Sequence, residues 1–422
     1  MGVLAALQHT GGVWFGWSGE TAESPASEPE IVTRGKVRFA TIDLKPAEFD
    51  GFYNGYCNGT LWPLFHYFPD RFTHEQPQYE AYQAVNEQFA RALLKVVEPG
   101  DAIWVHDYQL IPLGRCLRGL GFTGPIGFFL HIPFPHLQIL RLLPHYQRLV
   151  DDMVQYDRVG FQTENDVTSF LSCLDGRSVG VGAYPIGIDV DSVVSEAKIT
   201  HNQDTVQRMA ASLMGRKLIV GVDRLDYTKG LTERFLAYEQ FLETFPDTRG
   251  QVTFLQIAPP SRSDVLAYGE IRRGLEQTAG RLNGRFAEAD WTPIRYLNRD
   301  YTHATTMGFL RAAKVGLVTP VRDGMNLVAK EFVAAQDPED PGVLILSPMA
   351  GAAEDLTSAL LVNPYDKCGM AQALQTALNM PLQERRQRHE QMMAAVRKHD
   401  IHNWYGTFVH DLTGARLRRA AA

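Results

Sequence analysis

Short apolar segments alternate with longer amphipathic segments along most of this 422-residue chain, and the alternation limits the folds open to it. Runs of this kind are typical of strands buried on both faces of a sheet. They occupy residues 101–108, 125–132, 158–163, 181–188, 217–224, 252–259, 293–298, 315–320, 342–347 and 359–364. Helical patterns lie between or before many of them, for example at 80–97, 140–157, 231–245 and 263–282. The pattern predicts an α/β fold with parallel sheets and helices on both faces.

The length of the chain predicts more than one domain. A chain of 422 residues is too long for one compact core of ordinary size. The polar segment 189–205 is the expected boundary. We predict two Rossmann-like domains that face each other across a cleft, the first covering residues 1–190 and the second residues 191–399.

Composition excludes several classes of protein. The formal net charge of −7 argues against a general binder of nucleic acids or anionic membranes, so a phosphorylated ligand would need a local cluster of Arg and Lys. The four cysteines form no CxxC pair, which argues against a disulfide framework or a thiolate zinc site and favours a reducing cytoplasm. No apolar run reaches the roughly 18 residues of a transmembrane helix. The apolar N-terminus lacks the basic segment and cleavage site of a signal peptide.

Polar side chains gather where the predicted strands end. The carboxyl ends of parallel strands line one crevice of an open sheet, so we expect these side chains to share a cleft. They include His106, Asp107, His131, Asp223, Arg224, Asp226, Lys229, Arg262, Arg322 and Asp323. Arg224 and Lys229 flank a turn that opens a helix, and two cations beside helix N–H groups suit a diphosphate.

Most of these residues also have an ordinary structural explanation. The two cations could belong to a solvated salt-bridge surface, and Arg262 could cap a helix or form an ion pair. His131 could be a ligand, a general acid or a satisfied core group, whereas Asp107 at a sheet end needs a polar partner. Trp62 and Tyr53 suit sugar stacking and core packing equally. Without a Walker, HExxH or GxSxG motif or metal-ligand spacing, the residues predict only a cleft for a phosphorylated ligand.

Nine segments together resemble one known family. They are GGVWFGWSGE, LWPLFHY, IWVHDYQLIP, GFFLHIPFP, GFQTEND, YPIGID, VDRLDYTKGLTERFLAYE, IAPPSRSDV and VTPVRDGMNLVAKEFVAAQ. The match runs from about Gly11 to Trp404 and closely resembles the trehalose-6-phosphate synthases, retaining glycosyltransferases with two Rossmann-like domains. The resemblance implies transfer of glucose from UDP-glucose to glucose 6-phosphate, giving α,α-trehalose 6-phosphate and UDP. It also implies that the first domain binds the acceptor, with helices of about 400–422 packed back onto it.

The resemblance assigns the donor site to the second domain. Arg224 and Lys229 are expected to hold the diphosphate, Glu331 the ribose hydroxyls, and Tyr301 to stand where the backbone meets the uracil. Lys330, beside Glu331, is expected to point away into an ion pair. The glucosyl unit and the phosphate are expected to lie against Asp323 and the main chain of Gly324, Met325, Asn326, Leu327, Val328 and Ala329.

The acceptor site is assigned in the same way to the first domain and one residue of the second. Tyr53 and Arg262 are expected to contact glucose 6-phosphate, and Asp107 a sugar hydroxyl. Trp62 and His131 match positions associated with the choice of acceptor anomer and with sugar orientation.

The resemblance also implies a mechanism. We find no pair of carboxylates placed as a glycosidase would need them, which favours front-face displacement, with the leaving phosphate oxygen accepting the acceptor's proton. Arg224, Lys229 and a helix N-terminus would stabilise the charge on UDP. With Asp323 and His131, the two cations form the expected catalytic set, and no metal or other cofactor is expected.

One departure from the family concerns the N-terminus. Family members begin with a strand ending in Ser-Asn-Arg and a Gly-Gly-Leu loop, ahead of the helix that residues 1–8 resemble. Without that strand the first domain would have two unpaired sheet edges. The acceptor phosphate would also lose its contact with the Arg at the end of the strand. Either the start was assigned too late, which we favour because the other site residues are intact, or the chain is weakened or inactive.

Two rival hypotheses stay open. A related enzyme could use glycerol 3-phosphate or a cyclitol phosphate as acceptor, or GDP as the donor base, although Trp62, Tyr53, His131 and Arg262 all favour glucose 6-phosphate. Alternatively, the chain could be a catalytically silent sugar-phosphate sensor or partner subunit. Small-molecule substrates are the expected partners, without nucleic acid or membrane, and the sequence leaves a homo-oligomer open.

Overall fold

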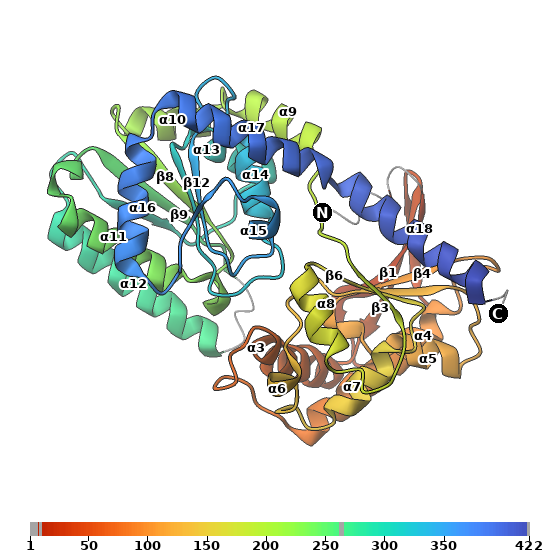
Figure 1. Ribbon diagram of the computed structural model, residues 1–422. Helices are drawn as coiled ribbons and strands as arrows, with labels where there is room; N and C mark the ends of the chain where they lie inside the picture. Colours follow the sequence, from red (N-terminus) through yellow and green to blue (C-terminus); the bar gives the residue numbers. More distant parts are fainter. Residues whose placement is uncertain (1–6, 8–10, 261–265, 420–422) are drawn as a thin grey trace. The chain divides into compact units, whose positions relative to one another are not determined.

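The computed structural model describes residues 7, 11–260 and 266–419 of the chain. It divides into two compact units (Figure 1). One unit runs to Ile186 and resumes at Ile401, and the other is Gly187–Asp400. Both contain parallel sheets, as the alternation of segments predicts. Within the described ranges, no helix is long and apolar enough to cross a membrane.

The second unit is built on a six-stranded sheet in which all neighbours are parallel. Its strands are β8 (Lys217–Val222), β9 (Val252–Ile257), β10 (Ile294–Leu297), β11 (Val315–Val318), β12 (Val343–Leu346) and β13 (Leu360–Leu361). Each lies within a segment predicted from the sequence. The order β10-β9-β8-β11-β12-β13 is the 3-2-1-4-5-6 order of the Rossmann fold. It reverses between β8 and β11, and open α/β sheets bind ligands at such a switch point.

Helices cover both faces of this sheet (Figure 1). One layer contains α9 (Val190–Thr200), α10 (Asp204–Ser212), α13 (His303–Ala312) and α14 (Leu327–Ala335). The other contains α11 (Leu231–Thr244), α12 (Leu266–Phe286) and α16 (Lys367–Asn379). Helix α17 (Leu382–Lys398) packs against α14 and the short α15 (Ala352–Asp355). Of the last two helices, only α18 (Ile401–Arg419) belongs to the first unit.

The polar segment 189–205, expected as the domain boundary, is largely helical and lies in the second unit. Asp189 caps α9 by accepting a hydrogen bond from Ser192 N at 3.0 Å. Val190, Val193 and Ala197 are buried along one side of that helix. Polar residues dominate the composition because they cover the other faces of the helix, so composition alone suggests a linker. The change of unit falls just before it, between Ile186 and Gly187.

Within the described residues, the strands of the first unit form two sheets. The parallel sheet β4-β5-β6-β7 consists of Ile103–His106, Ile126–Phe129, Arg158–Phe161 and Gly180–Ala183. The second sheet has the order β1-β3-β2 and consists of Gly12–Thr21, Val37–Leu44 and Glu30–Arg34. Strands β4 and β1 each stand at one end of their sheet. The sequence predicted β4 to β7 but none of the three strands of the second sheet. Strand β2 is exposed along its whole length, and β1 and β3 are only partly buried, so none of them forms a continuous buried apolar run.

Helix α18 lies on the parallel sheet of the first unit. Its buried residues Ile401, Trp404, Phe408 and Leu412 follow helical spacing. The ring of Phe408 rests where strands β5 and β6 have glycine, because a Cβ on Gly127 or Gly160 would stand 2.7 to 2.8 Å from it. The first unit also contains α4 (Gln76–Leu93), α5 (Leu113–Gly119) and α8 (Glu164–Leu171).

Two helical segments of the first unit differ from simple expectation. Of the predicted helix 140–157, only α7 (Tyr146–Met153) forms, and the short α6 (Leu137–Leu140) ends where the prediction begins. The helix starts late because proline disfavours the helical conformation of the residue before it and His145 has φ 63°. Before them, α2 (Pro46–Phe49) continues into the π-helix η1 (Asp50–Leu61) and then α3 (Trp62–Phe65). π-Helical turns are rare and frequently mark functional sites.

Candidate active site

The switch point of the second unit brings together the segments that follow β8 and β11. Strand β8 is followed by Asp223 and Arg224 and then by the short helix η3 (Tyr227–Lys229). Strand β11 is followed by a loop that ends at Asn326, the N-cap of α14. Arg224 is exposed, whereas Lys229 is only 9% exposed.

The two loops are joined by their backbones. The N–H groups of Val321 and Arg322 donate to the carbonyl of Thr228 at 2.9 and 3.2 Å. Gly230, at φ 63°, lies so close to the other loop that a Cβ there would stand 2.4 Å from the carbonyl oxygen of Thr319. Glycine is therefore required for both the backbone angle and the close approach.

Arg234 of α11 is fully buried and ties together the ends of three strands. Its guanidinium donates to Asp223 Oδ2 at 2.8 Å and to Gln256 Oε1 at 2.9 Å. It also donates to Thr319 Oγ1 at 3.1 Å and to the carbonyl of Lys229 at 3.3 Å. Burial raises the pKa of Asp223 above its ordinary value, so its charge depends on the guanidinium for compensation.

Lys229 and Asp323, both predicted site residues, form an ion pair at the switch point. Lys229 Nζ lies 2.5 Å from Asp323 Oδ2, and the two side chains are 11% and 14% exposed. Asn326 Nδ2 donates to the same carboxylate oxygen at 3.1 Å. The geometry places an ammonium group, a carboxylate and a helix N-terminus together, which suits an anionic group carrying a polyhydroxylated part.

The start of α14 is fixed by an unusual cap. Asn326 has φ 78°, and its Oδ1 accepts from the N–H of Ala329 at 3.2 Å. The N–H of Ala329, predicted to face the donor, is therefore already engaged within the cap. Leu327 and Val328 are the remaining predicted residues in the first turn, whose N–H groups have no intrahelical carbonyl. Gly324 and Met325, before the cap, are buried.

The adjacent residues Lys330 and Glu331 point to different partners. Lys330 is fully buried, and its Nζ lies 2.8 Å from Asp355 Oδ2, which confirms the predicted ion pair. Glu331, 15% exposed, has Oε1 3.3 Å from His303 Nε2. The other ring nitrogen of His303 lies 2.8 Å from Glu196 Oε2. Glu331 is thus held from one side at the start of α14.

Tyr301, the predicted contact for a base, immediately precedes the cap of α13. Its ring packs edge-on against Phe309, with 5.3 Å between centroids. The guanidinium carbon of Arg299 lies 4.6 Å from the centroid of the same ring. The side chain is therefore anchored by packing, and Tyr301 stands two residues before His303 in the chain.

In the first unit, Asp107 and His131 are in contact at the ends of β4 and β5. His131 N donates to Asp107 Oδ1 at 3.2 Å. Asp107 has φ 74° and ψ 167°, a region that non-glycine residues avoid at a cost of about 1–3 kcal/mol and that recurs at functional sites. His131 Nε2 lies 3.1 Å from His106 Nδ1, and burial lowers the pKa of both rings. Two neutral imidazoles satisfy this contact when one donates and the other accepts.

Trp62 and Tyr53 lie on the helical segment before α4. Trp62 is 4% exposed, and its ring centroid is 4.1 Å from His66 and 5.7 Å from Tyr108. Trp62 therefore packs in the core beside Tyr108, the residue that follows Asp107. Tyr53 is half-buried on the π-helix, stacked on Phe49 at 5.4 Å.

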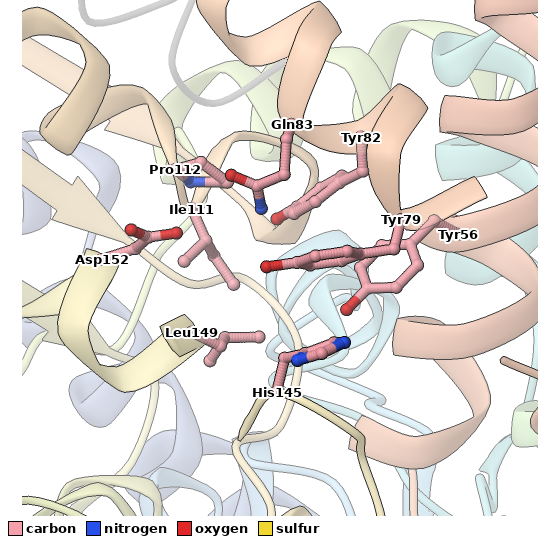
Figure 2. Close-up of a pocket in the computed structure, with 9 residues that line it drawn as sticks. All are labelled: Tyr56, Tyr79, Tyr82, Gln83, Ile111, Pro112, His145, Leu149 and Asp152. Carbon is pink, nitrogen blue, oxygen red and sulfur yellow. The ribbon is translucent and has the colours of Figure 1, made fainter. Parts of the chain in front are cut away.

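Other candidates contribute less. Arg262 lies outside the described residues. The first unit contains a cavity of about 10 Å³ that can hold one water but no sugar, lined as Figure 2 shows by Tyr56, Tyr79, Tyr82, Gln83, Ile111, Pro112, His145, Leu149 and Asp152. Within the described ranges, no three His, Cys, Asp or Glu side chains gather as metal ligands would. That no metal is needed stays a prediction.

The sequence assigned no role to three residues that the structure places at these sites. Arg234 had a usable signal, because it lies on the apolar stripe of α11 with Leu231 and Tyr238, where a charged residue needs a buried partner. His303 and Glu196 had none, since nothing in their local sequence shows that α9 and α13 meet.

Comparisons with known proteins agree on one family. The family model described as glycosyltransferase family 20 matches residues 2–414. A trehalose-6-phosphate synthase from Klebsiella pneumoniae is 46% identical, over 98% of this chain and 90% of that protein. A structure of an α,α-trehalose-phosphate synthase (UDP-forming) from Burkholderia xenovorans in complex with glucose-6-phosphate is 47% identical, with a TM-score of 0.96 over 98% of this chain and 95% of that one. A structure from E. coli bound with UDP-2-fluoro glucose is 45% identical, with a TM-score of 0.93 over 97% and 94% of the two chains.

Proposed function

The chain belongs to glycosyltransferase family 20, and on this premise we propose that it transfers glucose from UDP-glucose to glucose 6-phosphate with retention of configuration. The products are α,α-trehalose 6-phosphate and UDP. The observation that carries the proposal is the cluster of Lys229, Asp323 and the N-terminus of α14 at the switch point of a Rossmann sheet. The relatives bound to glucose-6-phosphate and to UDP-2-fluoro glucose add support.

The donor half of the reaction uses the second unit. Lys229 and Arg224 hold the diphosphate and compensate the negative charge that grows on UDP as the bond from glucose C1 to the phosphate oxygen breaks. The first-turn N–H groups of α14 act in the same direction. Asp323 accepts hydrogen bonds from glucose hydroxyls, and Glu331 accepts them from the ribose.

The acceptor half uses the first unit together with Arg262. The attacking hydroxyl of glucose 6-phosphate bonds to C1 on the face that UDP leaves, and its proton passes to the departing phosphate oxygen. This route retains configuration without an enzymic nucleophile. Asp107 binds a sugar hydroxyl, His131 acts in sugar orientation, and Tyr53 and Arg262 contact glucose 6-phosphate. Trp62 packs beside the segment that contains Asp107. It contributes to the choice of anomer by shaping the surface on which the acceptor binds.

The test is UDP release by the purified chain, alone and preceded by a strand and Gly-Gly-Leu loop of the kind its family carries. We expect UDP release only when UDP-glucose and glucose 6-phosphate are both present, and at an unchanged rate in excess EDTA. Glycerol 3-phosphate, a cyclitol phosphate and GDP-glucose serve as competing substrates. Faster turnover with one of them would support a related transferase instead. Binding of UDP-glucose without turnover in both forms would support a silent sensor.

A further inference from the structure

His303 lies between two carboxylates that come from different helices. It is the first residue of α13, after Thr302, whose Oγ1 caps the helix by accepting from Thr305 N at 3.2 Å. Its Nδ1 lies 2.8 Å from Glu196 Oε2 on α9, and its Nε2 lies 3.3 Å from Glu331 Oε1 on α14. One imidazole ring therefore connects three helices of the layer beside the switch point.

The two contacts determine the charge of the ring. An ionised carboxylate only accepts hydrogen bonds, so both ring nitrogens must carry protons and His303 must be an imidazolium. A cation at a helix N-terminus is disfavoured by the helix dipole, and partial burial also opposes it. The hydrogen bonds to Glu331 and Glu196 outweigh burial and raise the pKa of His303 to about 9.

Other charged groups on the neighbouring helices are engaged elsewhere or exposed. Lys330 on α14 is paired with Asp355. Lys198 on α9 and Asp204 and Arg208 on α10 are exposed. Glu331 and Glu196 are therefore the groups that hold the proton on His303.

The contact with His303 fixes the carboxylate of Glu331, which is proposed to bind the ribose hydroxyls of the donor. A glutamate side chain has several rotatable bonds, and ordering it on ligand binding costs conformational entropy. With Oε1 of Glu331 held by His303, the rotamer is set before the ligand arrives, and the carboxylate keeps acceptor capacity for hydroxyl donors. Tyr301, the proposed base contact, lies two residues before His303, so one short segment connects the base and ribose positions.

We propose that His303 is the positioning residue that fixes the Glu331 carboxylate for the ribose hydroxyls of the nucleotide donor, with Glu196 holding the opposite side of its ring. This inference rests on the proposed function, because it assumes that Glu331 meets a ribose. It assigns a role to a residue on α13, the helix that packs against α14. It also predicts that the affinity for the donor depends on the protonation of the His303 imidazole.

The test compares binding of UDP with binding of 2′,3′-dideoxy-UDP by calorimetry at pH 7, without acceptor or turnover. The wild-type chain is expected to prefer UDP by about tenfold or more, because the hydroxyls bind a charged acceptor. His303→Ala is expected to reduce that preference to within about twofold while binding dideoxy-UDP nearly as well as the wild type. His303→Arg, which keeps a cation with several donors, is expected to recover most of the preference.

A matched control is available in the same unit. His399 is as exposed as His303, at 27%, and its Nδ1 likewise lies 2.8 Å from a carboxylate oxygen, that of Asp355. His399→Ala should leave the preference for UDP unchanged. In a background of Glu331→Gln, His303→Ala should cause little further loss, because the carboxylate that it positions is already absent.

The pH profile gives a second readout. A raised pKa means that the bridge is intact at neutral pH and is lost as the pH rises through about 9. The preference of the wild type for UDP should therefore fall across that range, whereas that of His303→Arg should not. Equal weakening of UDP and dideoxy-UDP in a folded His303→Ala chain would overturn the inference and leave the proposed function standing. A wild-type chain that binds no UDP would instead overturn the proposed function and this inference with it.

Discussion

Replacement of Arg234 by methionine tests whether one buried cation holds together the ends of three strands beside the donor site. Methionine fills much of the same space but removes all four hydrogen bonds of the guanidinium. The carboxylate of Asp223, whose side chain is 2% exposed, loses its guanidinium partner. Breaking a buried ion pair from one side costs about 3–5 kcal/mol, because the remaining charge is uncompensated. We expect Arg234→Met to lower the free energy of unfolding of the second unit by that amount.

The pH dependence of this loss follows from Asp223. Its pKa is already raised by burial and should rise further without Arg234. An acid whose folded-state pKa is raised destabilises the fold progressively as the pH rises from its unfolded to its folded pKa. The loss in Arg234→Met should therefore be smaller at pH 5 than at pH 8.

A suitable assay follows Trp291, the single tryptophan between residues 187 and 400. It is buried, and its indole N–H donates to the carbonyl of Val252 at 2.8 Å. Urea unfolding of protein labelled with 5-fluorotryptophan, followed by fluorine NMR, therefore reports on the second unit alone. The control is Arg285→Met, which removes an arginine that is 52% exposed and paired with Glu239 and Glu243. That change should cost no more than about 1 kcal/mol.

A double variant isolates the charge effect. Asp223→Asn combined with Arg234→Met removes the unpaired charge, so it should be more stable than Arg234→Met alone. If Arg234→Met and Arg285→Met lose equal stability, or if Asp223→Asn brings no recovery, the reasoning from a buried and compensated pair is refuted.

Two further predictions concern the site itself. Arg224→Ala should lower kcat/KM roughly 10²-fold, as expected from a loss of about 3 kcal/mol of charge stabilisation in the transition state, with unchanged thermal stability because Arg224 is exposed; an unchanged kcat/KM would remove Arg224 from the site. Substitutions at the neighbours Lys330 and Glu331 should have different effects, the first on stability and the second on UDP binding. Lys330→Met should destabilise the second unit near the lower end of about 3–5 kcal/mol, since Asp355 keeps His399 as a partner, yet leave UDP affinity unchanged in the folded protein. Glu331→Gln should weaken UDP with little effect on urea unfolding, and the opposite pattern would show that their roles are reversed.

Much of the fold follows from local sequence pattern. Apolar runs identify strands such as β8, β9 and β11 because a strand buried on both faces is predominantly apolar. Strands β1, β2 and β3 escape detection because they are exposed or only partly buried. The helix expected over 140–157 forms only from Tyr146 to Met153, because Pro144 and a left-handed His145 interrupt the segment before it. The helices at 189–205 resemble a linker in composition, since only one narrow stripe of α9 is buried.

The site is predictable where its residues directly follow strands. Lys229 and Asp323 lie 94 positions apart, yet each comes after a strand, and the parallel order brings them together. The partnership of His303 with Glu331 and Glu196 depends on how three helices pack, which no local pattern encodes. The conformation of Asp107, with φ 74°, is likewise imposed by its surroundings, because aspartate has no local preference for it.

The most direct test of the proposed reaction is the structure of its product. UDP-glucose labelled with carbon-13 at glucose C1 is incubated with the chain and glucose 6-phosphate, and the product is examined by NMR. The account predicts that the label appears at a glycosidic carbon in the α configuration, joined to the C1 oxygen of an α-glucose 6-phosphate unit. A β-linked product, or label recovered as free glucose, would contradict glucosyl transfer with retention.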